Sequence, residues 1–162
     1  MLRLAYGLHQ LQFGKLMSIY EEENEKNGAL AAPQLPPGQQ ILQAEQSFYQ
    51  YLAESFFPIS HGVYAIWEEN GNYRCALRLE TYEDGLLLAA LETAPQFRRM
   101  GYAEMLIKAV HQKFEMKIYS HVEKRNISSL RIHEKCGFRQ IKDDAHYIDG
   151  SFSKTAVTFC YP

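Results

Sequence analysis

A histidine and a cysteine lie three positions apart in the segment RIHEKCGF, residues 131–138. The pair His133 and Cys136 raises three alternatives: half of a metal site, a nucleophile with its base, or the end of a helix. Zinc needs four converging ligands, and no second pair such as CxxC or HxxxH completes the set. A reactive thiol needs exposure and a lowered pKa, whereas a cysteine directly before a helix-ending Gly-Phe pair is expected to be buried. We therefore expect a helix end here.

A second segment, LETAPQFRRMGYAEML, joins the end of an apolar strand to the start of a helix. Backbone N–H groups at a helix start have no intrahelical partner, and the helix dipole adds positive potential, so such a turn can hold a phosphate or pyrophosphate. Gly101 and Ala103 leave the backbone accessible, and Arg98 and Arg99 add charge. The bare pattern Arg-x-x-Gly-x-Ala also fits an ordinary turn with two solvated arginines. It is neither a P-loop nor a three-glycine Rossmann fingerprint.

Hydrophobic periodicity predicts the elements that position these two segments. Period-two alternation indicates strands, and apolar residues at i, i+3, i+4 and i+7 indicate helices. We expect strands over 2–6, 63–69, 73–82, 86–93, 116–122, 138–148 and 152–161, and helices over 13–28, 41–56, around 103–110 and over 128–136, with a proline-rich loop at 29–38. This order predicts an α/β (α+β) fold with a mixed, largely antiparallel sheet and one β-α-β crossover. Without a repeat or linker, residues 1–162 are expected to form a single domain.

Composition excludes several classes of function. The formal net charge of −2 gives no overall attraction to nucleic acid or an anionic membrane. The longest apolar run, Leu86–Leu91, is far shorter than the roughly 20 residues that span a bilayer. Three widely spaced cysteines are typical of a reducing compartment. We expect a cytoplasmic protein with neither nucleic-acid nor membrane partners.

Together, the Arg98–Ala103 turn and the segment NISSLRIHEKCGF resemble the GCN5-related N-acetyltransferase (GNAT) superfamily. The resemblance covers roughly Gly62 to Cys160 by strand order, and it is sharpest over Leu91–Ala109 and Asn126–Phe138. It implies the GNAT fold, a mostly antiparallel central sheet of about seven strands with helices on both faces. It also implies acetyl-CoA as the cosubstrate.

The resemblance assigns cofactor-binding roles position by position. Arg98, Arg99, Gly101, Tyr102 and Ala103 match the loop that binds the acetyl-CoA pyrophosphate, mainly through backbone N–H groups. The residues that match contacts of the pantetheine arm are Leu91 and Thr93 at the end of a strand and Asn126 before the next helix.

The candidate catalytic residues are His133, His121 and Glu92. The family carries a tyrosine where this chain has His133, and that tyrosine is thought to protonate the departing thiolate. An imidazole could take over this role, or His133 could simply pack beside the cofactor. His121 matches a position where related enzymes carry a glutamate base, and Glu92 is a second candidate for the base. For both, a structural hydrogen bond or surface hydration is the alternative.

The resemblance implies an N-acetyltransferase that moves an acetyl group to a primary amine by direct attack in a ternary complex. Two alternatives stay open: a GNAT-fold protein that binds CoA without catalysis, serving as a sensor or assembly module, and a phosphate-ligand domain whose likeness is accidental. The amine acceptor and the oligomeric state, with a homodimer as one possibility, cannot be read from the residues.

Overall fold

The computed structural model describes residues 1–162. Its helices are α1 (Phe13–Ile19), α2 (Glu21–Ala31), α3 (Pro37–Tyr51), α4 (Tyr102–Lys113) and α5 (Ile127–Lys135). Its strands are β1 (Leu2–Ala5), β2 (Val63–Glu69), β3 (Asn72–Tyr82), β4 (Gly85–Thr93), β5 (Lys117–Glu123), β6 (Arg139–Lys142), β7 (Ala145–His146), β8 (Phe152–Ser153) and β9 (Ala156–Tyr161). A π-helical turn (Leu52–Phe56) extends α3, and short 3₁₀ turns cover Leu8–Gln10 and Pro95–Phe97.

Seven strands form one sheet in the order β1-β2-β3-β4-β5-β9-β6. Only β4 and β5 pair in parallel, because α4 provides the crossover between them. This confirms the predicted mixed, mostly antiparallel sheet. Asp149 and Gly150 lie in the turn that joins β7 to β8, which form a small separate sheet, while β6 and β9 pair in the main one.

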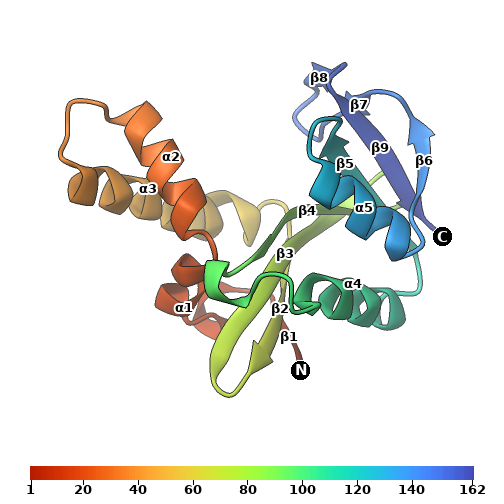
Figure 1. The fold of residues 1–162 in the computed structure, drawn as a ribbon, viewed down its shortest axis with the longest axis horizontal. Coiled ribbons are helices and arrows are strands. Elements are labelled where there is room, and N and C mark those ends of the chain that lie inside the picture. The colour runs from red at the N-terminus through yellow and green to blue at the C-terminus, as the bar shows by residue number, and fades with distance from the viewer.

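Helices cover both faces of the main sheet, as predicted. On one face, α4 packs its apolar side on β1 to β4, and α5 packs beside it near β5 and β9. On the other face, α1 and the π-helical turn bury a second cluster against β2 and β3. The α2–α3 hairpin projects from this side of the molecule (Figure 1). The sheet therefore separates two apolar cores.

The two central strands, β4 and β5, pair over only about half of their length and then diverge. β4 and β5 pair only from Gly85 with Lys117 to Leu88 with Ser120. Beyond this point β4 stays with β3, and β5 stays with β9, so the sheet opens into two diverging halves (Figure 1). The later part of β4 therefore has a free side.

Three local predictions were wrong. The helix expected over 13–28 is two helices, because the chain bends at Tyr20, whose side chain turns into the core. Gly28 does not end a helix: it lies inside α2, where an added Cβ would meet the Gln40 carbonyl oxygen at 2.2 Å. The loop expected at 29–38 is shorter, because Pro37 occupies the first turn of α3, where a missing N–H costs nothing.

No helix combines the length and apolar character needed to cross a membrane.

Candidate functional site

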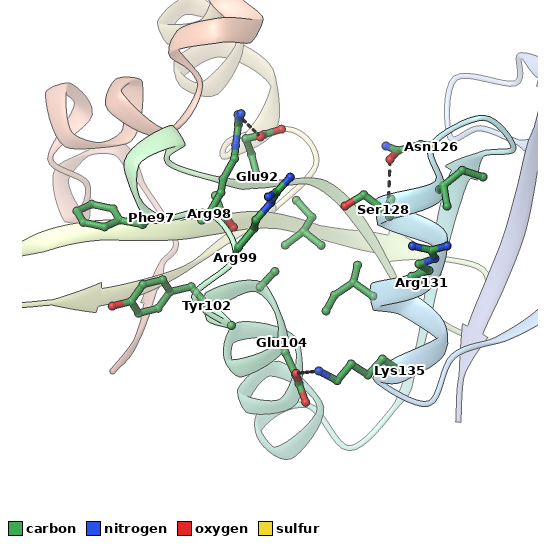
Figure 2. A pocket seen from close by; sticks show the side chains of 17 residues that line it. Glu92, Phe97, Arg98, Arg99, Tyr102, Glu104, Asn126, Ser128, Arg131 and Lys135 are labelled. Atoms are coloured by element: carbon green, nitrogen blue, oxygen red, sulfur yellow. Dashed lines mark hydrogen bonds and ion pairs between the residues drawn. The ribbon is translucent and has the colours of Figure 1, made fainter.

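A groove of about 840 Å³ lies between the β4–α4 turn and α5 (Figure 2). One wall comes from the end of β4, the turn and the start of α4, and the facing wall comes from α5. The lining residues are Leu91, Glu92, Thr93, Phe97, Arg98, Arg99, Gly101, Tyr102, Ala103, Glu104, Asn126, Ile127, Ser128, Ser129, Arg131, Ile132 and Lys135.

The N-terminus of α4 opens into this groove. Gly101, the N-cap, has a φ of +84°, which a glycine adopts without steric cost. The first full helical hydrogen bond joins the Met105 N–H to the Gly101 carbonyl at 3.0 Å. The N–H groups of the three residues between them therefore have no carbonyl in a preceding helical turn, which makes this end of α4 suited to an anion.

The N-terminus of α5 faces it across the groove. Asn126 caps α5, because its side-chain oxygen accepts a hydrogen bond from the Ser129 N–H at 3.1 Å. Ser128, Arg131 and Lys135 follow on one side of the helix and line the groove (Figure 2). Both walls thus combine a helix start with polar or basic side chains.

Basic side chains outnumber acidic ones in the lining, since Arg98, Arg99, Arg131 and Lys135 stand against Glu92 and Glu104. At one end, Glu104 pairs with Lys135 across the groove at 2.7 Å. Hydrogen bonds from Lys108 and Lys135 lower the pKa of Glu104 to about 2. The groove therefore carries positive charge although the whole chain is slightly acidic.

Arg98 joins the turn to α2. Its Nη1 and Nη2 donate to the two carboxylate oxygens of Glu22 at 3.1 and 2.9 Å, and Nη2 also donates to Glu92 at 3.2 Å. Burial raises the pKa of Glu92, and the guanidinium of Arg98 only partly opposes this shift. Glu92 is thus a carboxyl group that lines the groove and binds a proton more readily than usual.

Side-chain contacts with β2 and β3 support the β4–α4 turn on the side away from α5. The Tyr102 ring points away from α5 (Figure 2), and its hydroxyl donates to Glu69 at 2.6 Å. The guanidinium of buried Arg74 lies 3.7 Å from the centre of the Phe97 ring and 5.7 Å from that of Tyr102. These contacts tie both ends of the turn to β2 and β3, so the site is held by the sheet itself.

β4 contains a bulge where it borders the groove. Arg78 pairs with Ala89 and Ala76 with Glu92, so Leu77 alone opposes both Ala90 and Leu91. Ala90 has a φ of +53°, a left-handed conformation that costs an alanine about 1–2 kcal/mol.

His133 lies in the core. Only 2 % of its surface is exposed, and its ring packs between Phe138 and Phe159. Its Nδ1–H donates to the Ser129 carbonyl at 2.7 Å, so its Nε2 accepts from the Ser120 hydroxyl at 2.8 Å. Burial lowers the pKa of His133, with the Ser129 carbonyl opposing the shift. Both ring nitrogens are already bonded, and the ring does not line the groove.

His121 lies on the other face of the sheet. The Thr158 hydroxyl donates to the Asp144 carbonyl, so the His121 Nδ1–H donates to the Thr158 oxygen at 3.0 Å. Its Nε2 is buried without a hydrogen-bond partner, and Tyr82 and Tyr147 pack against the ring. Burial lowers the pKa of His121, and the side chain does not reach the groove.

Residues 17–138 match the sequence pattern of the family described as "Acetyltransferase (GNAT) family". The chain belongs to this family. GNAT membership confirms the resemblance seen in the two motif segments, and it supports acetyl transfer as the general chemistry.

Solved structures share the GNAT fold at low sequence identity. The ribosomal-protein-S18-alanine N-acetyltransferase of Escherichia coli is 15 % identical with a TM-score of 0.59, covering 100 % of this chain and 94 % of its own. The PaiA N-acetyltransferase of Thermoplasma acidophilum, solved in complex with coenzyme A, is 11 % identical with a TM-score of 0.60, covering 99 % and 98 %. A mutant of the spermidine N-acetyltransferase SpeG of Vibrio cholerae is 18 % identical with a TM-score of 0.61, covering 99 % and 92 %. No curated protein sequence matches the chain.

The GNAT groove brings together most of the residues singled out in the sequence. Those that line it are Leu91, Glu92, Thr93, Arg98, Arg99, Gly101, Tyr102, Ala103 and Asn126. His121 and His133 do not, for the packing reasons given above. Cys136 is buried as expected, burial raises the pKa of its thiol, and no three His, Cys, Asp or Glu side chains come together as a metal site.

Sequence reasoning missed the α5 wall of the GNAT groove. Ser128, Arg131, Ile132 and Lys135 follow Asn126 at helical spacing. This spacing could have indicated that they line the groove together with Asn126, since side chains three or four positions apart share one face of a helix.

Proposed function

We propose that this chain is an acetyl-CoA-dependent N-acetyltransferase that acts on a primary amine. The observation that carries the proposal is the groove itself: it joins two helix starts, four basic side chains and the free side of β4. The coenzyme A present in the similar T. acidophilum structure supports the same ligand class.

The turn and α5 would hold the charged part of the ligand. The free N–H groups at the start of α4 suit a pyrophosphate, with Arg99 beside them. Arg131 and Lys135 add positive charge on the facing wall. Arg98 is engaged by two carboxylates, so its role is to anchor the turn to α2 and β4.

The free side of β4 would bind the pantetheine arm and the thioester. The Ala94 N–H donates to the Arg74 carbonyl, and the alternation of an antiparallel pair then directs the Glu92 N–H toward β3 as well. The N–H groups of Leu91 and Thr93 therefore point the other way, into the space left by β5. An N–H group there can stabilise the oxyanion that forms when an amine attacks the carbonyl.

Glu92 is the side chain that we assign to proton removal from the acceptor. The amine nitrogen attacks the thioester carbonyl, the carbon–sulfur bond breaks so that CoA leaves as its thiolate, and the proton of the attacking nitrogen passes to Glu92 directly or through water. A base with a raised pKa takes a proton more readily, which favours this role. Holding both substrates in one cleft supplies much of the acceleration.

Binding of CoA without catalysis is the second candidate. The observation that favours it is the burial of His133, which leaves no imidazole at the groove where the family carries its acid. Neither His133 nor His121 is assigned a catalytic role.

The two candidates separate in two measurements. Acetyl-CoA at about 100 times its Kd should stabilise the folded protein by about 2.7 kcal/mol, seen as a raised Tm. No shift at millimolar acetyl-CoA would exclude both candidates. A panel of amines assayed for release of free CoA then decides between them. Release with at least one amine supports the enzyme, and the absence of release with every amine supports the binding protein.

The Glu92→Gln variant tests the base. Losing a general base typically lowers kcat by about 10²–10⁴-fold, and the acid limb of the pH–rate profile should disappear. Glu68→Gln is the matched control, because Glu68 pairs with Arg3 at the edge of the sheet and lies outside the groove. Equal activity in both variants would remove Glu92 from the mechanism.

A further inference from the structure

Two buried tyrosines form a hydrogen-bonded chain that ends at the β4 bulge. Tyr64 lies on β2 with 0 % of its surface exposed, and Tyr20 lies at the bend between α1 and α2 with 6 % exposed. The Tyr64 hydroxyl donates to the Tyr20 hydroxyl at 2.9 Å, and the Tyr20 hydroxyl donates to the Ala90 carbonyl at 2.7 Å. Ala90 is the bulge residue with a positive φ.

The bulge decides which way the Leu91 N–H points. If the register that pairs Arg78 with Ala89 continued without a bulge, Leu91 would pair with Ala76 and direct its N–H toward β3. With it, Glu92 takes that place, and the Leu91 N–H turns to the free side of β4. One inserted residue thus moves a backbone donor from the sheet to the groove.

This conformation needs support from its surroundings. An alanine in the left-handed region persists only where neighbouring contacts hold it. Ala90 and Leu91 have no partner residue on β5, whose pairing with β4 ends at Leu88. The Tyr20 hydroxyl is the side-chain donor that fixes the Ala90 carbonyl.

We propose that Tyr20 and Tyr64 are positioning residues, which hold the β4 bulge and so aim the Leu91 N–H at the thioester. The proposal rests on the proposed function, because it takes the groove to hold an acyl-CoA. It also explains the bend at Tyr20: the break between α1 and α2 is where this side chain enters the core.

The two phenols are suited to a permanent structural role. Burial raises the pKa of Tyr20 well above its ordinary value and that of Tyr64 to about 12. Both hydroxyls therefore stay protonated, and the direction of donation toward Ala90 stays fixed.

Tyr20→Phe is the central test, with Tyr73→Phe as its matched control. Tyr73 is a buried tyrosine of the same core, but the hydrogen bond of its hydroxyl is accepted from the Gln12 N–H at 3.2 Å and does not involve β4. We expect Tyr20→Phe to lower kcat about tenfold with the KM for acetyl-CoA changed less than about twofold, since a misaimed oxyanion donor acts on the transition state. Tyr73→Phe should leave kcat unchanged. Tyr64→Phe keeps the bond to Ala90 and should have a smaller effect than Tyr20→Phe.

Glycine at the bulge gives a rescue that a general loss of stability would not show. Because glycine adopts a positive φ without cost, adding Ala90→Gly to Tyr20→Phe should restore most of kcat. Equal kcat values for Tyr20→Phe and Tyr73→Phe in an active enzyme would overturn the proposal while leaving the proposed function intact.

Backbone hydrogen exchange tests the same contact without any substrate. Residues 88–93 should exchange about tenfold faster in Tyr20→Phe than in Tyr73→Phe, because one local hydrogen bond is lost. A wild-type chain that transfers no acetyl group would overturn the proposed function, and the exchange rates would then decide the bulge contact alone. Unchanged exchange in Tyr20→Phe would overturn that contact.

Discussion

His133 shows that a motif position and a side-chain direction are separate properties. The family motif puts this residue where a tyrosine is usual, and the spacing from Asn126 to Phe138 is kept. On α5, however, the ring packs toward Phe138 and Phe159, while Ser128, Arg131 and Lys135 point to the groove. Because both nitrogens of the imidazole form hydrogen bonds inside the core, the side chain is held there and does not extend into the groove.

Replacing His133 by phenylalanine should affect stability and spare catalysis. The change leaves the Ser120 hydroxyl and the Ser129 carbonyl without their partner. Leaving a buried polar group unpaired costs about 1–3 kcal/mol, which urea denaturation would measure. His9→Phe, at an exposed position, is the control. A tenfold loss of kcat in His133→Phe with unchanged stability would return a catalytic role to this residue.

At the scale of elements, the β4–α4 turn depends on a backbone conformation that only glycine adopts freely. Gly101 and Gly150 have nearly equal φ values of +84° and +86°, and an added Cβ meets no atom within 4 Å at either. They differ in place: Gly101 caps α4 in the groove, and Gly150 turns between β7 and β8.

Alanine at each of these glycines should separate strain from binding. The left-handed conformation costs an L-residue about 1–2 kcal/mol, so both variants should lose similar stability. In Gly101→Ala the turn relaxes away from its binding geometry, and acetyl-CoA should bind about tenfold more weakly, corresponding to about 1.4 kcal/mol. Titration calorimetry checks this. The same loss of affinity in Gly150→Ala would mean that the turn has no special role.

The α2–α3 hairpin depends on a different property of glycine. At Gly28 an added Cβ would lie 2.2 Å from the Gln40 carbonyl oxygen, so the two helices would have to separate. We expect Gly28→Ala to lower the free energy of unfolding by about 1–3 kcal/mol. Gly38→Ala, on α3 with no atom within 4 Å, should be neutral or stabilise by up to about 1 kcal/mol. Equal thermal stability of the two variants would contradict the close packing.

Local patterns predicted the elements well where one period dominates. The strand expected over 63–69 has the bounds of β2, and β3 and β4 differ by one residue at their starts, because alternation persists along each. The periodicity of Phe13, Leu16, Met17 and Tyr20 runs up to the bend, and neither a proline nor a glycine marks the bend itself, so the break could not be predicted. Gly28 was misread because its reason is a contact with a helix that comes later in the chain.

At the scale of the whole molecule, the net charge of the chain does not describe the local charge of the groove. A formal net charge of −2 hides a groove in which basic side chains outnumber acidic ones, because acidic residues gather elsewhere, as on α2. The motif segments predicted the β4–α4 wall of the groove, since backbone N–H groups and glycine leave a sequence signal. The tyrosine chain behind β4 left none, because Tyr20, Tyr64 and Ala90 meet only in the folded chain.

The folded protein as a whole should lose stability on mild acidification. Burial lowers the pKa of His111 to about 4, with the charge of His133 adding to the effect, and burial also lowers the pKa values of His121 and His133. In the unfolded chain each histidine titrates near 6.5. Below that pH the unfolded state binds protons that the folded state does not, so the free energy of unfolding falls by up to about 1.4 kcal/mol per pH unit for each histidine.

The pH range over which the folded protein loses stability identifies the histidines as the cause. The carboxyl group of Glu104, with a pKa of about 2, contributes stability that is present above pH 4.5 and is lost only below it. Urea denaturation at pH 7.5, 5.5 and 4.5 should therefore show falling stability before the ion pairs of Glu104 are lost. His111→Phe, which keeps an aromatic ring against Tyr161, should flatten the slope. Because its pKa is shifted furthest, His111 continues to act near pH 4.5, and an unchanged slope in this variant would contradict the assignment.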